Sequence, residues 1–326
     1  MPGRLVVTPP SGFIEFPFHD GEIAARRRAG VTSGGAAIRA IMPDQHRQFF
    51  AGLRYLLIAA LDPDGAPAAT MLFGQPGFVT SPDPVTLRID GVPAADDPIG
   101  ALLTEGAPIA VLGIDLATRR RNRANGTIAM AGAGGITVAV AQSFGNCPQY
   151  IQSRSLISPP IGRGAATERL GGLDGAARQA IRAADTFFVA SSSGARGGPM
   201  FGADISHRGG RPGFVRVDGD TLTVPDFHGN RYFNTLGNIL LEPRVALLFP
   251  DFRTGSLLHV SGEATVEWES PEAAAFTGAE RLWRVRVSNV WRRTGALPGD
   301  WAFGGYAPTT GRTGQWADGR HAGWTP

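Results

Sequence analysis

The sequence predicts a mainly β protein that consists of two consecutive β-barrels with flanking helices, and two observations carry this prediction. The first is an internal repeat with a constant spacing of 136 positions. The string PGFV at 76–79 returns at 212–215, and Asp90, Leu112, Asp115, Thr118 and Gly126 return as Asp226, Leu248, Asp251, Thr254 and Gly262. A constant spacing without gaps indicates that one supersecondary unit was copied. The second is a series of short apolar runs separated by turn signals, which is typical of antiparallel barrels or sandwiches rather than parallel α/β sheets.

Residues 1–52 are predicted to form an N-terminal helical lead-in, with helix over 19–52. Pro43-Asp44 is a helix start signal ahead of QHRQFFAGL, and Asp44 can cap that helix. Phe49, Phe50 and Leu53 then form an apolar stripe.

The first barrel is predicted over 53–160. Its β-like runs are RYLLIAAL, PAATMLF, VTLRID, PIAVLGID and ITVAVAQ, with a turn at 62–65 and a tight hairpin turn at GAGG. The segment 153–177 is rich in Gly, Pro and Ser, so we expect it to connect the two halves.

The second barrel is predicted over 175–300, from DTFFVASS through GFVRVDGDTLTV and RVALLFPDF to LLHVSGEATVEWE. Asp218-Gly219 marks a hairpin turn, and NRYFNTLGNILLE is expected to be helical. Residues 301–326 form a tail rich in Gly and Trp, which is either disordered or laid over a cleft by Trp316 and Trp324.

Composition narrows the functional classes. The 326 residues are 43% hydrophobic and 18% charged, which suits packed cores. No apolar run approaches the ~20 residues of a membrane span, the N-terminus lacks a secretion signal, and Cys147 is the single cysteine, so we expect a cytoplasmic protein without membrane contact. The net charge of +3 is too small to indicate nucleic-acid binding. All 31 basic residues are arginine, which excludes a lysine Schiff base and a P-loop lysine.

The two copies differ at two places, and there the second copy gains polar chemistry. It has SHRGG and GNRYFNTLGN where the first copy has TMLFG and the acidic AADDPIGALL. We expect Gly229-Asn230 to lie just before a helix, so that free N–H groups and the helix dipole gather beside Arg231 as an anion site. Asn234 and Asn238 would present amides on one helix face. The alternative is a capped surface helix with solvated asparagines.

The SHRGG string suits a flat ligand. On a strand edge, Ser206, His207 and Arg208 supply donors, and Gly209-Gly210 would let a planar ring approach the backbone closely. Together the two segments favour an aromatic group that carries a phosphate, such as a nucleotide or flavin mononucleotide (FMN). A glycine bulge at a barrel corner with a solvated arginine is the alternative.

The TRRRNR run in the first half is predicted to be a strand, because it is the copy of a barrel strand. Alternation sends Arg119, Arg121 and Arg123 to one face and Arg120 to the other. One face is expected to meet the second barrel or a phosphate, with a solvated or salt-bridged face as the default.

SHRGGRPGFVRV and LTVPDFHGNRYFNTLGNILLEPRVALLF, together with SFGNCPQYIQ and TRRRNRANG in the first half, resemble the pyridoxamine 5′-phosphate oxidase-like FMN-binding split-barrel family. The resemblance covers about 19–300, and the first-half strings, with MPDQHRQFF upstream, resemble the branch with tandem barrels. It implies a six-stranded Greek-key barrel in each half, and a pseudo-dimer in which the first half is the structural partner and the second half cradles FMN between the barrels.

The resemblance also implies the cofactor contacts. The phosphate falls to Arg208, Asn230 and Arg231. The isoalloxazine edge falls to Ser206, His207, Gly209, Pro225 and Asp226, with further contacts from Gly210, Asn234, Cys147 and Gln149. We expect Cys147 to shape a turn that meets the cofactor rather than to act as a nucleophile. No catalytic residue is assigned, and His207 and Arg208 are the candidates for steadying negative charge.

The predicted function is an FMN-dependent oxidoreductase that transfers hydride or electrons to or from an unidentified small molecule. Electrons would come from a separate reductase or from the substrate, and a homodimer is compatible with the sequence. The alternatives are a flavin carrier or sensor without turnover, and a barrel that binds haem or a deazaflavin. No metal is predicted, because the six histidines lack ligand spacing, and neither GxGxxG nor GxSxG occurs in a fitting context.

Overall fold

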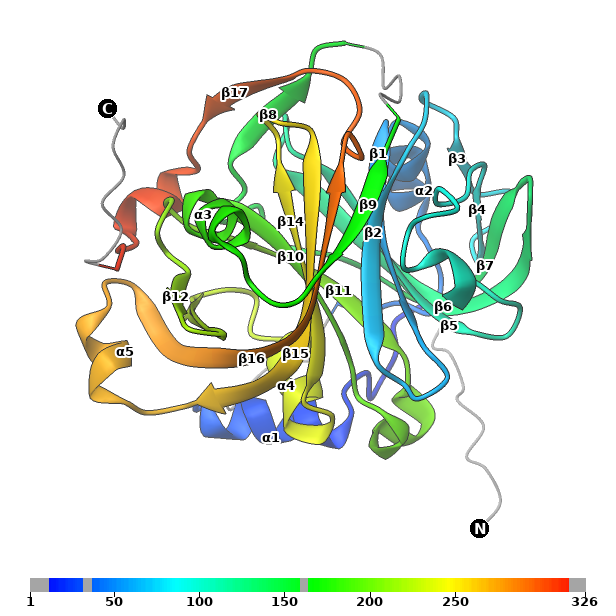
Figure 1. Ribbon diagram of the computed structural model, residues 1–326. Coiled ribbons are helices and arrows are strands. Elements are labelled where there is room, and N and C mark those ends of the chain that lie inside the picture. Colours follow the sequence, from blue (N-terminus) through cyan, green and yellow to red (C-terminus); the bar gives the residue numbers. More distant parts are fainter. Residues whose placement is uncertain (1–11, 32–36, 159–163, 317–326) are drawn as a thin grey trace.

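The computed structural model describes residues 12–31, 37–158 and 164–316. Two large antiparallel sheets follow one another along the chain and lie side by side (Figure 1). The first has the order β2-β1-β5-β6-β7-β4-β3, with β1 Tyr55–Leu61, β2 Pro67–Phe73, β3 Val79–Thr80, β4 Thr86–Ile89, β5 Pro108–Asp115, β6 Arg120–Gly132 and β7 Gly135–Gly145. The second has the order β11-β10-β14-β15-β16-β13-β12, with β10 Thr186–Ser192, β11 Ala203–Gly209, β12 Arg216–Asp218, β13 Thr221–Phe227, β14 Arg244–Asp251, β15 Ser256–Glu267 and β16 Ala279–Thr294. We call them the first and second barrels.

The two barrels repeat one fold, because each strand of the first has a counterpart at the same place in the second. The repeat extends to a β-bulge at Gly126 in β6 and at Gly262 in β15. A Cβ on Gly126 would lie 1.9 Å from the Ala139 oxygen, and one on Gly262 would lie 2.2 Å from the Arg286 oxygen. The predicted six strands per barrel is wrong, because the short strands β3 and β12 extend each order to seven.

Three apolar cores explain why the central strands β1 and β10 are buried along their whole length. In β1, Leu56 and Ile58 pack inside the first barrel, whereas Leu57 and Ala59 point to a core that both barrels share. Strand β10 does the same, with Phe187 in the second barrel's interior and Phe188 in the shared core. A strand that is buried on both faces carries a continuous apolar run. The runs LLIAAL at 56–61 and FFVA at 187–190 therefore encode the contact between the barrels.

The N-terminal region is helical only in part. Helix α1 spans Asp20–Arg28 and helix α2 spans Asp44–Ala51. Between them, Arg39 forms an isolated β-bridge with Ser143, so a continuous helix over 19–52 is wrong. The N-cap of α2 is Pro43 without a side-chain cap; Asp44 is the first helical residue and pairs with Arg47 at 2.9 Å. The predicted apolar stripe of α2 is buried.

The described part of the connection between the barrels contains regular secondary structure. It contains β8 Ser153–Leu156, β9 Ala166–Leu170 and helix α3 Gly175–Ala183. Strand β9 pairs with the C-terminal part of β16, at 290–294. Strand β8 pairs with β17 Trp301–Gly305 from the C-terminal region.

The remaining helices are α4 Asn234–Leu241, α5 Pro271–Ala275 and the 3₁₀ turns η1 Gly100–Leu102, η2 Ala195–Met200 and η3 Pro308–Arg312. In the tail, Trp316 packs on Phe276 and its Nε1 donates to the Phe214 oxygen at 2.9 Å. Trp316 therefore covers the second barrel's core, whereas Trp324 lies outside the described residues.

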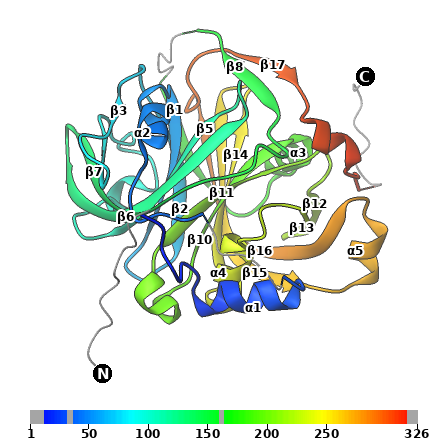
Figure 2. The same ribbon diagram turned by 180° about the vertical axis from the view of Figure 1, so that it is seen from behind.

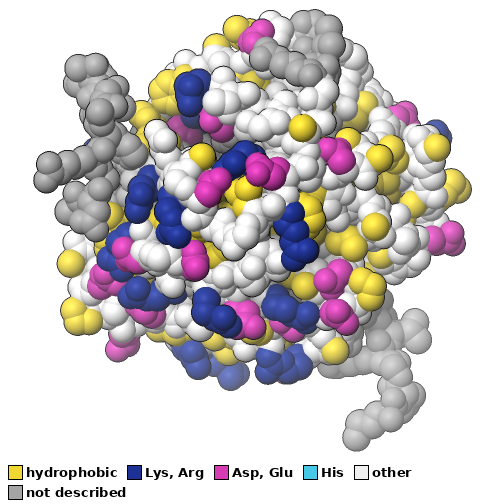
Figure 3. Space-filling model, viewed as in Figure 1, with side chains coloured by type: hydrophobic (Ala, Val, Ile, Leu, Met, Phe, Trp, Pro, Cys, Tyr) yellow, Lys and Arg dark blue, Asp and Glu magenta, His cyan; other side chains and the backbone are white. Residues whose placement is uncertain are grey.

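The surface carries arginines interspersed with carboxylates (Figure 3). Around α5 and β16, Arg284 pairs with Glu267 and Glu272, and Arg286 pairs with Glu263. In the described ranges, no helix has both the length and the apolar character needed to cross a membrane.

Candidate functional site

A pocket lies where the two barrels meet, with about 850 Å³ of space including its open mouth. The first half contributes Arg121 and Arg123 of β6 and the segment 146–150, which follows β7. The second half contributes β11, the end of β13, the segment 229–236 and the start of β16. All predicted cofactor-binding residues except Gly210 line it: Cys147, Gln149, Ser206, His207, Arg208, Gly209, Pro225, Asp226, Asn230, Arg231 and Asn234.

The two glycines of SHRGG do not serve as a platform for a ring. A Cβ on Gly209 would lie 2.1 Å from the Tyr150 oxygen, and one on Gly210 would lie 2.5 Å from the Phe214 ring. Their missing side chains therefore make room for the protein itself. Gly209 lets the first half's segment 146–150 reach the pocket, which is a different role from the one predicted.

The anion site is built differently from the prediction, because helix α4 begins later. Its N-cap is Phe233, and Gly229-Asn230 lie several residues before the helix. Arg231 and Phe233 both have left-handed backbones, with φ of 58° and 63°. This irregular segment turns Arg231 toward Glu280, whose Oε1 lies 3.5 Å from its Nη2. Asn230 Nδ2 donates to Asn146 Oδ1 at 3.2 Å and so bridges the two halves.

Asp226 organises the second barrel's other cations. Its Oδ1 accepts from Arg208 Nη1 and its Oδ2 from Arg281 Nη1, each at 2.5 Å. Arg281 reaches Asp226 because the two residues are paired across β13 and β16. Arg208 also lies over the Trp283 ring, at 5.9 Å from its centroid. Asp226 is thus an anchor for two guanidinium groups and not itself a free acceptor for a ring edge.

Arg121 and Arg123 do face the second barrel, as strand alternation predicts. Arg121 Nε donates to the Cys147 oxygen at 2.9 Å, and its Nη1 lies 3.2 Å from His207 Nδ1. Since a guanidinium can only donate, His207 Nδ1 accepts and the imidazole proton lies on Nε2. Burial, reinforced by Arg121 and Arg208, holds the pKa of His207 well below its usual value.

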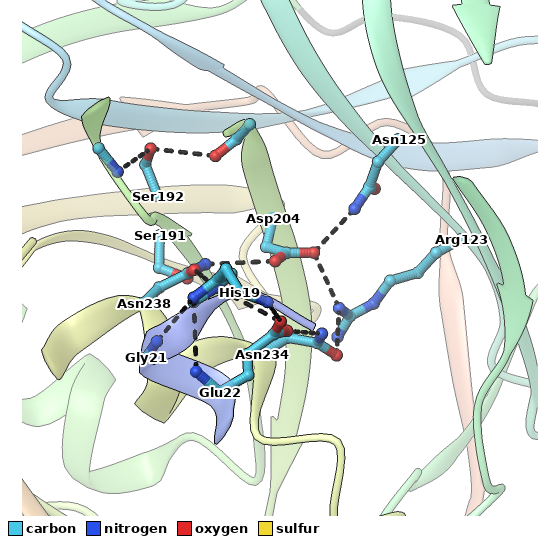
Figure 4. A network of polar contacts seen from close by, with 12 residues as sticks. His19, Gly21, Glu22, Arg123, Asn125, Ser191, Ser192, Asp204, Asn234 and Asn238 are labelled. Atoms are coloured by element: carbon cyan, nitrogen blue, oxygen red, sulfur yellow. Dashed lines mark hydrogen bonds and ion pairs between the residues drawn. The ribbon is translucent and has the colours of Figure 1, made fainter. Parts of the chain in front are cut away.

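Arg123 belongs to a buried polar network that ties the N-terminal region to both barrels (Figure 4). Its Nη1 pairs with Asp204 Oδ1 at 3.1 Å, and its Nη2 donates to Ser206 Oγ. Asn234 Nδ2 donates to Glu22 of α1, while Asn238 Oδ1 lies 2.8 Å from His19 Nε2. The two asparagines therefore hold α1 beneath α4 (Figure 2) instead of presenting their amides to solvent or ligand.

Glu22 has an unusual electrostatic environment in this network. Burial, reinforced by the nearby Asp204, raises the pKa of Glu22 to about 8. The carboxyl is therefore neutral at pH 7 in the folded protein, which limits the cost of burying it.

Gln152 holds the segment 146–150 in place. Its buried Nε2 donates to the oxygens of Tyr150 and Gly210, at 3.2 and 3.3 Å, and to Thr310 Oγ1 at 3.0 Å. Its Oε1 accepts from Ala307 N at 2.9 Å. One side chain thus joins the first half's segment, the residue that follows β11, and η3, so the C-terminal region supports the pocket.

The pocket has unused donors. Buried nitrogens without a hydrogen-bond partner are found on several lining residues: Arg123 Nε, Asn146 Nδ2, His207 Nε2, Arg208 Nε and Arg231 Nε. Buried polar atoms are normally paired, so such a cluster needs an explanation. The lining also holds five arginines against two carboxylates, Asp226 and Glu280. This donor set suits an anionic ligand with several acceptor atoms, and FMN meets that description.

Several lining residues escaped the sequence prediction, above all Glu280 and Arg281. They lie on β16, far along the chain from both motifs, and reach the pocket only through the pairing of β16 with β13. Tyr150, Phe227 and Phe233 supply apolar lining. In the described ranges, no group of three or more His, Cys, Asp or Glu side chains could hold a metal ion.

Residues 173–293, which include the second barrel except for the last residue of β16, match the family model described as pyridoxamine 5′-phosphate oxidase. The match confirms, over the second barrel, the resemblance to the pyridoxamine 5′-phosphate oxidase-like family. No curated protein shows significant sequence similarity to the chain.

Solved structures with similar parts include a HupZ variant from Group A Streptococcus (TM-score 0.30, 12% identity, 37% of this chain and 98% of that one). A protein of Mesorhizobium loti described as FAD-binding has a TM-score of 0.26 and 11% identity, and the match covers 40% of this chain and 96% of that one. General Stress Protein 26 of Bacillus anthracis has a TM-score of 0.25 and 10% identity, and the match covers 38% of this chain and 92% of that one. Likenesses this low carry no conclusion about function.

Proposed function

We propose that the pocket between the barrels binds FMN and that the protein is an FMN-dependent oxidoreductase. The observation that carries the proposal is the cluster of unpartnered donors on arginine, histidine and asparagine around one pocket. The match of the second barrel to the oxidase family model supports the choice of a flavin over other phosphorylated ring compounds.

The phosphate is assigned to Arg231, Asn230 and Arg208 at the mouth of the pocket. Arg231 has a side chain that is 40% exposed, and its 3.5 Å contact with Glu280 is long for an ion pair, so it can turn to an incoming phosphate. Arg208 keeps its Nε free while Asp226 fixes its Nη1. Both arginines therefore have an Nε that can donate to a phosphate.

The ring is assigned to the inner part of the pocket, beside His207 and Ser206. His207 stays neutral and can donate its Nε2 proton to a ring acceptor, since Arg121 occupies Nδ1. When bound, FMN supplies the hydride and electron transfer chemistry, and the protein supplies position, hydrogen bonds and positive charge. The excess of arginine favours negative charge on the ring or on a substrate oxygen.

Electrons come either from the substrate or from a separate donor protein, and the substrate is a small molecule that reaches the open mouth. A flavin carrier would bind FMN with the same residues but would not turn over. Reduction of the bound flavin by NADH or NADPH, followed by reoxidation with a candidate acceptor, separates an enzyme from a carrier.

Titration of the apoprotein with FMN, followed by quenching of flavin fluorescence, tests the binding site. Arg231→Ala should raise the Kd at least tenfold, because a charge-assisted hydrogen bond contributes about 1.5–3 kcal/mol. Arg120→Ala is the matched control, since Arg120 is exposed on the opposite face of β6 and does not line the pocket. Equal effects of the two substitutions, or no binding at all, would contradict the proposal.

A further inference from the structure

Because of the duplication, the first barrel contains a site that corresponds to the pocket of the second barrel, and we call it the mate site. Because the copies keep a spacing of 136, Ser206, His207 and Arg208 correspond to 70–72 (Thr, Met, Leu), and Asn230-Arg231 correspond to 94–95 (Ala, Ala). The correspondence is structural. A Cβ on Gly74 would meet the Phe78 ring at 2.3 Å, as one on Gly210 would meet the Phe214 ring at 2.5 Å.

The mouth of the mate site is an apolar groove. It is lined by Val92, Pro93, Ala94, Ala95, Gly100, Ala101, Leu103, Ala131, Gly132, Ala133 and Ile136. No lining residue is charged, whereas the pocket of the second barrel presents Asn230 and Arg231 at the same place. The groove therefore has neither a cation nor a side-chain amide to receive a phosphate.

The inner part of the mate site is filled by Arg293 at the end of β16. Arg293 is paired with Leu257 across β15 and β16. Leu257 is the counterpart of Arg121, whose backbone oxygen accepts a hydrogen bond from Asn146 N. Arg293 therefore has the position in the mate site that Asn146 has in the pocket of the second barrel. Asn146 leaves the pocket open. The Arg293 guanidinium, which is 4% exposed, instead extends into the first barrel.

Arg293 is held there by a closed set of partners. Its Nη1 lies 2.5 Å from Asp97 Oδ2, its Nη2 3.1 Å from Asp96 Oδ1, and its Nε donates to Thr167 at 3.0 Å. Thr70, the counterpart of Ser206, donates to the same Asp97 oxygen at 2.6 Å. Every nitrogen of the guanidinium has a partner, in contrast to the free Nε atoms of Arg208 and Arg231.

Two more differences close the mate site. Asp97 occupies the position of Phe233, so a buried carboxylate stands where the other pocket has an aromatic ring. Strand β9 pairs with Val290–Thr294 of β16 and brings Thr167 onto Arg293. Asp96 and Asp97 repel an anion, and they hold both terminal nitrogens of Arg293.

We propose that the chain binds one flavin, at the second barrel only, and that the mate site has been converted into an internal ion pair beneath an apolar groove. This inference rests on the proposed function. It makes the first barrel a partner that lends Arg121, Arg123 and Asn146 to the second barrel's pocket and receives Arg293 in return.

The test is the number of FMN molecules bound per chain. The full-length apoprotein is dialysed to equilibrium against saturating FMN, and bound flavin is measured by absorbance after denaturation, with protein from amino-acid analysis. One FMN per chain is expected. Two per chain would overturn this inference and leave the proposed function standing, whereas no bound FMN would overturn both.

Two variants sharpen the test. Arg231→Ala should raise the Kd of all measurable FMN binding at least tenfold. If half of the sites kept the wild-type Kd in this variant, the inference would be overturned. Ala95→Glu places a carboxylate at the exposed position that corresponds to Arg231. It should leave one FMN per chain with a Kd within twofold of wild type, and a lower stoichiometry would show that the mate site binds flavin.

Discussion

Arg121 of the first barrel donates to Nδ1 of His207 in the second barrel, with 3.2 Å between the two nitrogens. This contact sets the tautomer of a pocket histidine from the opposite half of the molecule. It also explains why the pocket needs both copies of the repeat, since neither barrel alone contains the donor and the acceptor.

The first prediction concerns the ionisation of His207. Burial and the two adjacent arginines lower its pKa, so the Cε1–H resonance of His207 should not titrate near pH 6.5. In Arg121→Ala, one source of positive potential is gone, and the pKa should move upward. Proton NMR between pH 5 and 8 measures both. A His207 that titrates normally in the wild type would refute the assigned hydrogen-bond arrangement.

The second prediction concerns the pH dependence of stability. The pKa of Glu22 is about 8 in the folded protein and near 4.5 in the unfolded chain. Between these two pH values the folded state therefore binds more protons at Glu22 than the unfolded state does. The Glu22 contribution is thus present at low pH and is lost as pH rises toward 8.

The loss of this contribution should lower the free energy of unfolding by about 2 kcal/mol between pH 6 and 8. Urea denaturation of apoprotein at several pH values measures the slope. Glu22→Gln should remove that part of the slope whatever its own stability, and identical slopes would show that Glu22 is ionised in the folded state.

The third prediction concerns the buried pair Arg123–Asp204, whose side chains are 6% and 14% exposed. Removing one partner leaves a charge without its main counter-ion, so Arg123→Met and Asp204→Leu should each cost about 3 kcal/mol. The double variant should cost less than the sum, with a coupling of about 1–3 kcal/mol. Chemical denaturation of the four proteins gives the cycle, and simple additivity would argue against a direct interaction.

The fourth prediction concerns Gly209. A Cβ at this position would collide with the Tyr150 oxygen, so Gly209→Ala should displace the segment 146–150 and weaken FMN binding roughly tenfold. Gly171→Ala is the control, because a Cβ there meets nothing within 4 Å and its φ is not left-handed. Fluorescence titration with FMN compares them. Wild-type affinity in Gly209→Ala would mean that this segment does not shape the pocket.

The sequence predicts the fold well because the signals are local or repeated. The apolar runs mark β1 and β10, and the constant spacing predicts that one strand order occurs twice. The same spacing locates the places where the copies differ, and these become the pocket and its mate. The motif residues meet because 206–209 and 225–236 belong to one barrel, on strands β11 and β13 and the segment that leads into α4.

Contacts that depend on distant pairing could not be predicted. Arg281 reaches Asp226 through strand register, and His19 reaches Asn238 across 219 positions. The glycines of SHRGG show the same limit. A sequence reveals that a side chain is absent at Gly209, but only the fold shows that Tyr150 occupies the space.

FMN binding between the barrels is tested most directly by a crystal structure of the protein grown with FMN. We predict flavin density between the barrels, with the phosphate within hydrogen-bonding distance of Arg231 and Asn230 and the ring beside His207. A pocket filled by the protein's own side chains, or FMN bound at the groove of Ala94 and Ala95, would contradict the account.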